Sequence, residues 1–354
     1  MLNVGIIGVT GYAGENLLNI LLKHPEVKIA YLAAKLNSKQ NINQIFPYLN
    51  NRLELECDNV LDKQKAAERC DLLFLALPHT VSMQFAPDLL SKGKGIIDLS
   101  ADYRLVNKDV YEKFYRVKHT DKVNFKKAVY GLPEIYRMKI KNTRFIANPG
   151  CYPTAAILAL APLLKNKLIR PDSVIIDAKS GFSGAGREFV LKEKEEILRN
   201  FKAYKVNVHQ HMPEIDQEIS KIYGKQLKVV FVPHILPIEK GILETIYVQK
   251  IKNQKSCLSG RQACLSGRQA KINNLVKLYR DFYAKEPFVR ILDEGKFPQI
   301  KDVVETNFCD IGIKETAVEV IIISAIDNLL KGASGQAVQN MNIMYGFPED
   351  TALS

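Results

Sequence analysis

The sequence lacks the features that mark membrane, disulfide-linked and zinc-binding proteins. None of its apolar runs reaches the roughly 20 residues that span a bilayer, and its first residues predict a strand rather than a charged leader. The cysteines, at positions 57, 70, 151, 257, 264 and 309, form no C-x-x-C pair, which argues against a disulfide framework and a zinc site. We therefore expect a cytoplasmic protein with no membrane partner and no metal.

Basic residues are not gathered as they are in nucleic-acid-binding proteins. The formal net charge is +12, but lysine and arginine are spread along the chain without an aromatic-interleaved cluster. We interpret this charge as general lysine enrichment that also suits anionic ligands, and expect no nucleic-acid partner. With 354 residues and 47% apolar content, the chain is long enough for two domains that share a cleft.

The first part of the chain alternates between strand-like and helical patterns. Strands are expected over residues 2–7, 28–33, 72–77, 95–99 and 143–147, and helices over 17–22 and 81–91. This alternation predicts an α/β fold with a doubly wound, parallel Rossmann-type sheet.

The second part of the chain is rich in strand-like segments. These segments cover residues 173–179, 227–232, 243–251 and 317–325. They predict an α+β domain whose mostly antiparallel sheet can face a partner subunit. A helix over 327–345 is expected to return to the first domain. The predicted boundaries are therefore 1–148 with 327–354 for a cofactor-binding domain, and 149–326 for a catalytic and dimerisation domain.

A heptapeptide occurs twice in tandem, at residues 257–263 and 264–270. One repeat is too short for a solenoid, so we interpret it as a duplication inserted in a surface loop, where extra length costs little. The alternative, a metal or redox role for the two cysteines seven residues apart, is less favoured.

A cysteine lies where a strand turns into an apolar helix. Asn148, Pro149 and Gly150 neither continue a strand nor begin a helix, while residues 155–164 are almost wholly apolar. Cys151 is thus placed at a helix N-terminus, whose dipole favours thiolate over thiol at neutral pH. We predict that Cys151 is a nucleophile, the alternative being a buried, inert cysteine.

A glycine-rich turn follows the first strand with the spacing G-x-x-G-x-x-G. Such turns let backbone amides approach a pyrophosphate at a helix N-terminus, although they also occur without ligands. The predicted cofactor-binding residues of this turn are Gly8, Thr10, Gly11, Tyr12, Ala13 and Gly14.

The loop after the second strand contains no acid, which NAD-preferring sites usually carry there. Lys35 and Ser38, with Lys39, are instead available for a 2′-phosphate. The loop therefore favours NADP(H), although lysines on a loop can simply be solvated.

Three further segments directly follow predicted strands and should line one crevice. Ligands of doubly wound sheets lie beyond the carboxyl ends of the strands. Pro78 and His79 follow one strand, Arg104 lies in the loop after the next, and Cys151 follows a third. We expect the nucleotide and the cysteine to meet there.

Two histidines and a carboxylate are the predicted partners of the thiol. His209 and His211 alternate on a segment expected to be extended, so both imidazoles can face the cleft, and Glu214 can orient one of them. The pattern leaves open which histidine is the acid or base.

Several segments together resemble one enzyme family. They are residues 8–14, 98–104, 130–134, 148–154, 180–187, 209–214 and 327–336. From about residue 2 to 347 the chain is similar to the N-acetyl-γ-glutamyl-phosphate reductases, except for the heptapeptide repeat. The resemblance implies NADPH-dependent reduction of N-acetyl-γ-glutamyl phosphate to N-acetyl-glutamate 5-semialdehyde, with phosphate release, in arginine biosynthesis. It also implies a thioester on Cys151. We further expect a homodimer or homotetramer that binds a small-molecule acyl phosphate.

The resemblance extends to residues whose spacing alone assigns no role. Ser180, Gly181, Ser183 and Gly184 resemble the loop on the nicotinamide side, and Asn328 is a candidate for the carboxamide. The substrate-binding candidates are Arg104, Arg187 and Asn148. The two arginines are chosen because a guanidinium binds phosphate or carboxylate with two parallel hydrogen bonds. Either arginine can instead form a structural ion pair.

Three rival functions remain. An aspartate-semialdehyde dehydrogenase has similar fold and chemistry, but residues 130–134 and 209–214 fit the acetylglutamyl enzyme better. A reductase of carrier-protein-linked aminoadipyl phosphate would also suit a basic surface. A nonenzymatic dinucleotide-sensing protein would have no need for a cysteine and a histidine in one cleft.

Overall fold

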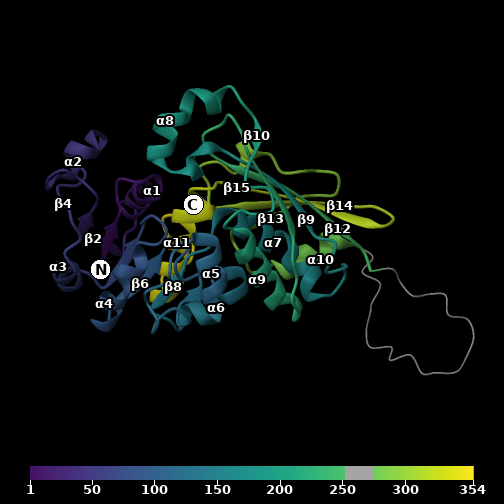
Figure 1. Cartoon of the computed structure of the whole chain (residues 1–354), viewed down its shortest axis with the longest axis horizontal. Helices are drawn as coiled ribbons and strands as arrows, with labels where there is room; N and C mark the ends of the chain where they lie inside the picture. The colour runs from purple at the N-terminus through teal and green to yellow at the C-terminus, as the bar shows by residue number, and fades with distance from the viewer. Residues whose placement is uncertain (252–273, 354) are drawn as a thin grey trace, which may run out of the picture.

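The computed structural model describes residues 1–251 and 274–353, which fold around two sheets. Within these residues the strand orders are β3-β4-β2-β1-β5-β6-β8-β7 and β10-β11-β9-β12-β15-β14-β13. Figure 1 shows the elements of the first sheet on one side of the molecule and the long strands of the second on the other. The predicted repeat loop at 257–270 lies outside the described residues. No helix of the described part is long and apolar enough to cross a membrane.

The first sheet confirms the predicted Rossmann-type fold. Its strands are β1 Leu2–Ile7, β2 Val27–Ala33, β3 Gln40–Asn41, β4 Glu56–Asp58, β5 Leu72–Leu75, β6 Gly95–Asp98, β7 Val129–Tyr130 and β8 Phe145–Ala147. All neighbours pair in parallel except β3 with β4. Its helices are α1 Tyr12–Leu21, α2 Ile42–Ile45, α3 Lys63–Arg69, α4 Ala86–Ser91, α5 Lys108–Tyr115 and α6 Pro133–Lys141.

Two elements of this half are shorter than expected. The predicted strand over 72–77 ends at Leu75. The predicted helix over 81–91 divides into a 3₁₀ turn, Ser82–Gln84, and α4, which has Pro87 in its first turn. Proline fixes φ and has no N–H, so it starts a helix more readily than it continues one.

The second sheet confirms the predicted, mostly antiparallel arrangement. Its strands are β9 Ile175–Ser180, β10 Lys202–Ala203, β11 Val230–Ile235, β12 Ile242–Gln249, β13 Val289–Ile291, β14 Cys309–Glu315 and β15 Glu319–Ile326. Its helices are α7 Cys151–Lys165, α8 Arg187–Leu198, α9 Met212–Tyr223 and α10 Leu275–Phe282. The apolar helix α7 packs on one face of this sheet and contributes to a continuous core with β9, β12 and β15. That packing fixes the position of its first residue, Cys151.

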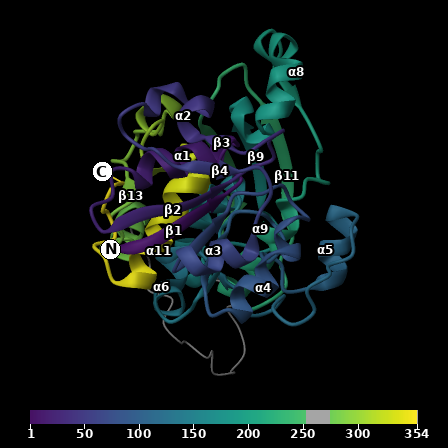
Figure 2. The same cartoon turned by 90° about the vertical axis from the view of Figure 1, so that its left-hand side faces the viewer.

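The C-terminal segment leaves the second sheet and packs on the first. After β15 the chain forms a π-helical turn, η5 Leu330–Ser334, and the helix α11 Gly335–Tyr345. Ala337, Val338 and Met341 share a core with Val4 and Leu17. Figure 2 shows α11 beside α1 and the first strands, and α8 projecting away from this layer.

Candidate active site

The glycine-rich turn joins β1 to α1 with close backbone contacts. Gly8 has φ +90°, and a Cβ there would lie 2.2 Å from the carbonyl oxygen of Ala76. A Cβ at Gly14 would lie 2.2 Å from the oxygen of Gly8. These two positions therefore require glycine for the turn itself. A Cβ at Gly11, the N-cap of α1, would approach no nearer than 3.6 Å to the oxygen of Gly8.

This turn can hold an anionic cofactor group. The first amides of α1, around Thr10, Tyr12 and Ala13, lie at the positive end of the helix dipole. Because Gly8 and Gly14 keep the turn tight and Gly11 leaves it uncovered, the residues fit the pyrophosphate of a dinucleotide.

The loop after β2 differs in part from its prediction. Lys35 and Ser38 are exposed, as a 2′-phosphate site requires. Lys39, however, forms an ion pair with Glu56 at 2.5 Å. The sequence pattern did not reveal an acid that lies next to the end of β2. This acid is Asp58, at the end of β4, which pairs with Ala33 of β2. Its oxygens accept hydrogen bonds from Lys65 Nζ at 2.6 and 2.8 Å, so this carboxylate is already neutralised.

The loops after β5 and β6 are bonded to each other. The exposed Pro78 and His79 follow β5, and His79 Nδ1 accepts a hydrogen bond from the Ala101 amide at 3.1 Å. Asp102 accepts from the amides of Thr80 and Met83 at 2.6 and 3.0 Å. These bonds hold the two loops together at the carboxyl ends of their strands.

Cys151 is the first residue of α7, after the N-cap Gly150. Burial raises the pKa of its thiol to about 12, while the Tyr152 amide and Arg104 act in the opposite direction. Desolvation therefore opposes the thiolate expected at neutral pH, and it outweighs the effect of the helix terminus. The thiol needs a base.

His211 lies against the glycine that precedes the nucleophile, and His209 accepts a hydrogen bond from its backbone amide. His211 is the N-cap of α9 with helical angles (φ −78°, ψ −16°), so the expected extended segment is wrong. A Cβ at Gly150 would lie 2.7 Å from His211 Nε2, which places the imidazole against the residue before Cys151. His209 Nδ1 accepts from the His211 amide at 3.0 Å. Burial lowers the pKa of His209 to about 3 and that of His211 well below its usual value, so both are neutral.

Glu214 does not orient a histidine, contrary to the prediction. It accepts hydrogen bonds from the Gly150 amide at 2.8 Å, Tyr130 Oη at 2.7 Å and Arg104 Nη1 at 3.3 Å. The pair with Arg104 is buried on both sides. Glu214 therefore anchors the turn that presents Cys151.

Arg104 and Asn148 serve the same turn. Arg104 Nε donates to the Asn148 oxygen and Nη2 to the Leu99 oxygen, both at 2.7 Å. Asn148 Nδ2 donates to the Ala333 oxygen at 3.0 Å, and its Oδ1 accepts from Asn340 at 3.1 Å. With its side chain buried and bonded at both ends, Asn148 is a structural residue rather than the expected substrate ligand.

Arg187 forms the ion pair that sequence reasoning kept as an alternative. Its Nη2 pairs with Glu15 of α1, and its guanidinium lies 4.6 Å from the centroid of the Tyr12 ring. Arg187 thus connects the start of α8 to the helix of the glycine-rich turn, rather than presenting a free guanidinium to substrate.

The loop at 180–186 is held by Asn328. Asn328 Nδ2 donates to Ser183 Oγ at 2.9 Å, and its Oδ1 accepts from the Gly241 amide at 2.7 Å. Ser180 Oγ donates to the Gly181 oxygen, and a Cβ at Gly181 would lie 2.7 Å from the Glu239 oxygen. A Cβ at Gly184 would lie 3.7 Å from Asn328 Nδ2, so there is space beside this glycine in the loop. Asn328 shapes the loop, which differs from the expected direct bond to a carboxamide.

Comparison with known proteins identifies the family. Residues 3–143 match the family model "Semialdehyde dehydrogenase, NAD binding domain", and residues 151–328 match "Semialdehyde dehydrogenase, dimerisation domain". An aspartate semialdehyde dehydrogenase II from Vibrio cholerae superimposes with a TM-score of 0.72 at 18% identity, covering 98% of each chain, which shows a shared fold.

Two full-length relatives are much closer in sequence. N-acetyl-gamma-glutamyl-phosphate reductase from Desulforudis audaxviator is 46% identical over the whole of this chain and 98% of the relative. The enzyme of the same name from Geotalea daltonii is 47% identical with the same coverage. With this identity over its full length, the chain belongs to the N-acetyl-γ-glutamyl-phosphate reductase family of the semialdehyde dehydrogenases.

Proposed function

We propose that this protein reduces N-acetyl-γ-glutamyl phosphate to N-acetyl-glutamate 5-semialdehyde with NADPH, releasing phosphate, as a step of arginine biosynthesis. The observation that carries the proposal is the cysteine at the start of α7 with a neutral histidine against the preceding glycine. Relatives at 46% and 47% identity bear the name of this activity.

The first half-reaction forms a thioester on Cys151. The sulfur attacks the γ-carbonyl, a C–S bond forms, and the bond from the acyl carbon to the phosphate oxygen breaks. His211 takes the thiol proton, since its imidazole is neutral and next to the turn. Forming the thioester first lets phosphate leave before reduction.

A backbone amide at the start of α7 stabilises the oxyanion of the tetrahedral species. Gly150 N–H is bonded to Glu214, and Thr154 N–H is bonded to the Gly150 oxygen. Pro153 has no N–H, so Cys151 and Tyr152 are the first-turn residues left to donate. The Tyr152 amide already interacts with the sulfur, which leaves the Cys151 amide for the oxygen.

The second half-reaction releases the aldehyde. When bound, NADPH supplies the hydride that reduces the thioester carbonyl. The protonated His211 returns its proton to the Cys151 sulfur as the C–S bond breaks. The glycine-rich turn would hold the pyrophosphate, and the Ser180–Gly184 loop, kept in shape by Asn328, would lie on the nicotinamide side.

The function is tested by the choice of acyl phosphate. NADPH oxidation is measured with N-acetyl-γ-glutamyl phosphate, β-aspartyl phosphate and carrier-linked aminoadipyl phosphate. We expect the first to be preferred by at least about 100-fold in kcat/KM, because rejection of a wrong polar substrate leaves buried groups unpaired. Faster turnover of either rival, or NADPH binding without turnover of any, would overturn the proposal.

NADPH should be preferred over NADH, and Lys35→Ala should reduce that preference about tenfold. An exposed lysine that bonds the 2′-phosphate contributes about 1.5 kcal/mol, a factor of about ten in binding. Lys35 is the better test because Lys39 is paired with Glu56. Steady-state kcat/KM is measured for both cofactors, with Lys28→Ala on β2 as the exposed-lysine control. Equal use of both cofactors by the parent protein would contradict this assignment.

His211→Asn should change the shape of the pH profile as well as the rate. The parent is expected to keep a constant kcat/KM from about pH 6 to 8, because the pKa of His211 is lowered and the imidazole stays neutral. Without this base, the rate should follow the thiolate, whose fraction rises tenfold per pH unit below a pKa of about 12.

The control for this profile is His234→Asn, which alters a histidine paired with Asp177 on β9. It should retain the parent's flat profile. A flat profile in His211→Asn would show that another group takes the proton.

The domain division and the assembly are part of the same proposal. Residues 1–148 with 327–354 form the cofactor domain, and residues 149–326 form the catalytic and dimerisation domain of a cytoplasmic homodimer or homotetramer. An exposed row of large apolar side chains on the second sheet supports the assembly. The row consists of Ile175, Val230 and Tyr247, which are in register across β9, β11 and β12 and are 43%, 46% and 37% exposed. Light scattering at micromolar concentration measures the mass, and a monomer would contradict the assembly.

A further inference from the structure

One turn of the chain contacts both the proposed nucleophile and the glycine-rich turn. A Cβ at Gly332, in the π-helical turn η5, would lie 2.7 Å from the Cβ of Cys151. The next residue, Ala333, accepts from Asn148 Nδ2 at 3.0 Å, and Ser334 Oγ donates to the Ala13 oxygen at 2.8 Å. Three successive residues therefore touch the nucleophile, the turn before it and the glycine-rich turn. π-Helical turns are rare in proteins, and those that do occur often lie at functional sites.

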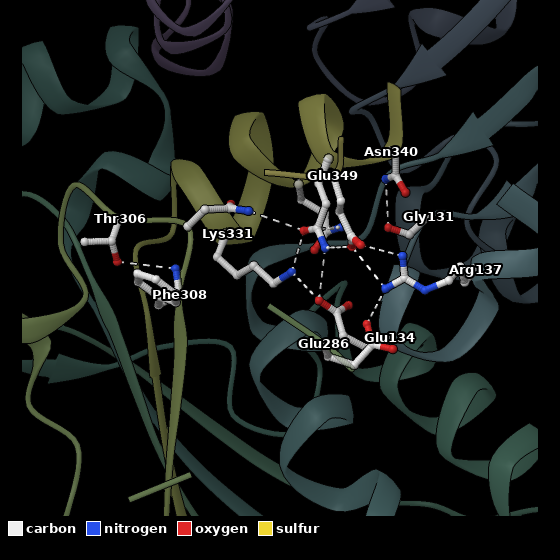
Figure 3. A network of polar contacts seen from close by, with 12 residues as sticks. Gly131, Glu134, Arg137, Glu286, Thr306, Phe308, Lys331, Asn340 and Glu349 are labelled. Atoms are coloured by element: carbon white, nitrogen blue, oxygen red, sulfur yellow. Dashed lines mark hydrogen bonds and ion pairs between the residues drawn. The ribbon is translucent and has the colours of Figure 1, made fainter. Parts of the chain in front are cut away.

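The remaining polar residue of this turn is a completely buried lysine. Lys331 Nζ donates to Glu134 Oε1 at 2.6 Å and to Gln339 Oε1 at 2.7 Å, and neither Lys331 nor Glu134 is exposed. Figure 3 shows the Lys331 side chain extending from the C-terminal segment toward Glu134 on α6. A buried ammonium is tolerated only with a good partner, so this contact fixes where η5 lies relative to α6.

A second layer of ion pairs lies outside this buried pair. Gln339 Nε2 donates to Glu349 Oε1 at 2.8 Å, and Arg137 pairs with both Glu349 and Glu286 (Figure 3). The side chain of Arg137 is 34% exposed, and it bonds to Glu286 and Glu349, neither of which lies in η5. The inner pair therefore holds the turn at Cys151, while the outer pairs hold the chain end to α6 and to the segment before β13.

We propose that the buried Lys331–Glu134 pair is a positioning device: it fixes η5 so that Gly332 holds Cys151 in register with the cofactor turn. Lys331 and Glu134 are positioning residues and touch neither substrate nor cofactor. The inference deepens the proposed function and rests on it for the role of Cys151. A displacement of about 1 Å at reacting atoms can reduce a rate by about 100-fold.

The experiment compares Glu134→Gln and Lys331→Met with Arg137→Met. The outer variant removes two ion pairs of the same network but leaves Lys331 and Glu134 in place. For each protein we would measure kcat and KM, NADPH binding, urea unfolding, and the rate at which iodoacetamide alkylates Cys151, mapped by peptide mass spectrometry.

The two inner variants are expected to lower kcat at least about tenfold, with the substrate KM and NADPH Kd within about threefold of the parent. The alkylation rate of Cys151 should change by a similar factor, because its neighbour Gly332 moves. Arg137→Met should keep kcat and alkylation within about twofold even where its unfolding midpoint falls.

Two results would overturn the inference. One is an inner variant that folds and keeps the parent's kcat. The other is an Arg137→Met protein whose kcat falls as far as that of an inner variant with the same unfolding midpoint. If Lys331→Met does not fold, Glu134→Gln decides, since its amide keeps the size and an acceptor oxygen. The alkylation measurement needs no substrate. A parent inactive on the acyl phosphate would refute the proposed function, while unequal alkylation of the inner and outer variants would still support the positioning device.

Discussion

Cys151→Ser is expected to abolish acyl-phosphate reduction, by about 1,000-fold or more in kcat, while NADPH binds within about threefold of the parent. The reason lies in the burial of the site. Desolvation already raises the pKa of the thiol to about 12, and burial lowers the pKa of the neighbouring His211. A serine hydroxyl is far less acidic than a thiol, so the same weak base cannot activate it. NADPH oxidation measures the loss of acyl-phosphate reduction, and fluorescence-detected binding measures the affinity for NADPH.

The matched control is Cys70→Ser, which makes the same change at a buried cysteine after α3. It should retain activity within a few-fold. Appreciable turnover by Cys151→Ser would refute the covalent mechanism. Loss of NADPH binding in that variant would show that Cys151 has a structural role in the cofactor site.

The fold was predictable because each half of the chain carries a regular local signal. Apolar strands alternating with helical patterns identify the parallel sheet, since β1 and β2 lie within one residue of their predicted bounds. β14 was missed although its apolar residues alternate at Cys309, Ile311 and Ile313, because Asp310 and Gly312 interrupt the apolar run. Aspartate and glycine are both depleted in strands, so the segment gives only a weak strand signal.

The side-chain partners within the site were far less predictable. The helix mouth at Cys151 follows from local sequence, as does the tight turn at Gly8 and Gly14. Glu214, however, bonds to Gly150 and Arg104, which are 64 and 110 residues away in the chain. Its closeness in sequence to His211 suggested a pairing, but its oxygens are bonded to Gly150, Tyr130 and Arg104 instead. Sequence spacing cannot reveal contacts between distant elements.

Burial also changed the chemistry expected of the thiol. A helix N-terminus stabilises a nearby anion by about 1 kcal/mol or less at an exposed site. Loss of hydration can shift the pKa of a buried group by several units in the opposite direction. Sequence shows the helix start at Cys151 but not how deeply the sulfur is buried, so it gives the smaller effect and misses the larger one.

Removal of the Glu214 carboxylate is expected to have the largest effect on stability. Glu214→Ala should lower the free energy of unfolding by about 3 to 5 kcal/mol, because it leaves the Arg104 guanidinium charged, buried and without its carboxylate partner. The Gly150 amide and Tyr130 hydroxyl lose their acceptor as well. Urea unfolding measures the loss, and Glu196→Ala, which removes an exposed partner of Lys202, should not change the midpoint.

A double variant separates the stability of this pair from its role in presenting Cys151. Arg104→Met with Glu214→Leu replaces both charges by apolar side chains, which is often neutral for stability at buried ion pairs. We therefore expect the double variant to unfold closer to the parent than Glu214→Ala does. Its activity should stay low, because the Gly150 amide lacks its anchor and Arg104 no longer lowers the pKa of the thiol. Recovery of both stability and activity would show that the pair only supports packing, and equal instability of the two variants would place the cost in the lost hydrogen bonds to Gly150 and Tyr130.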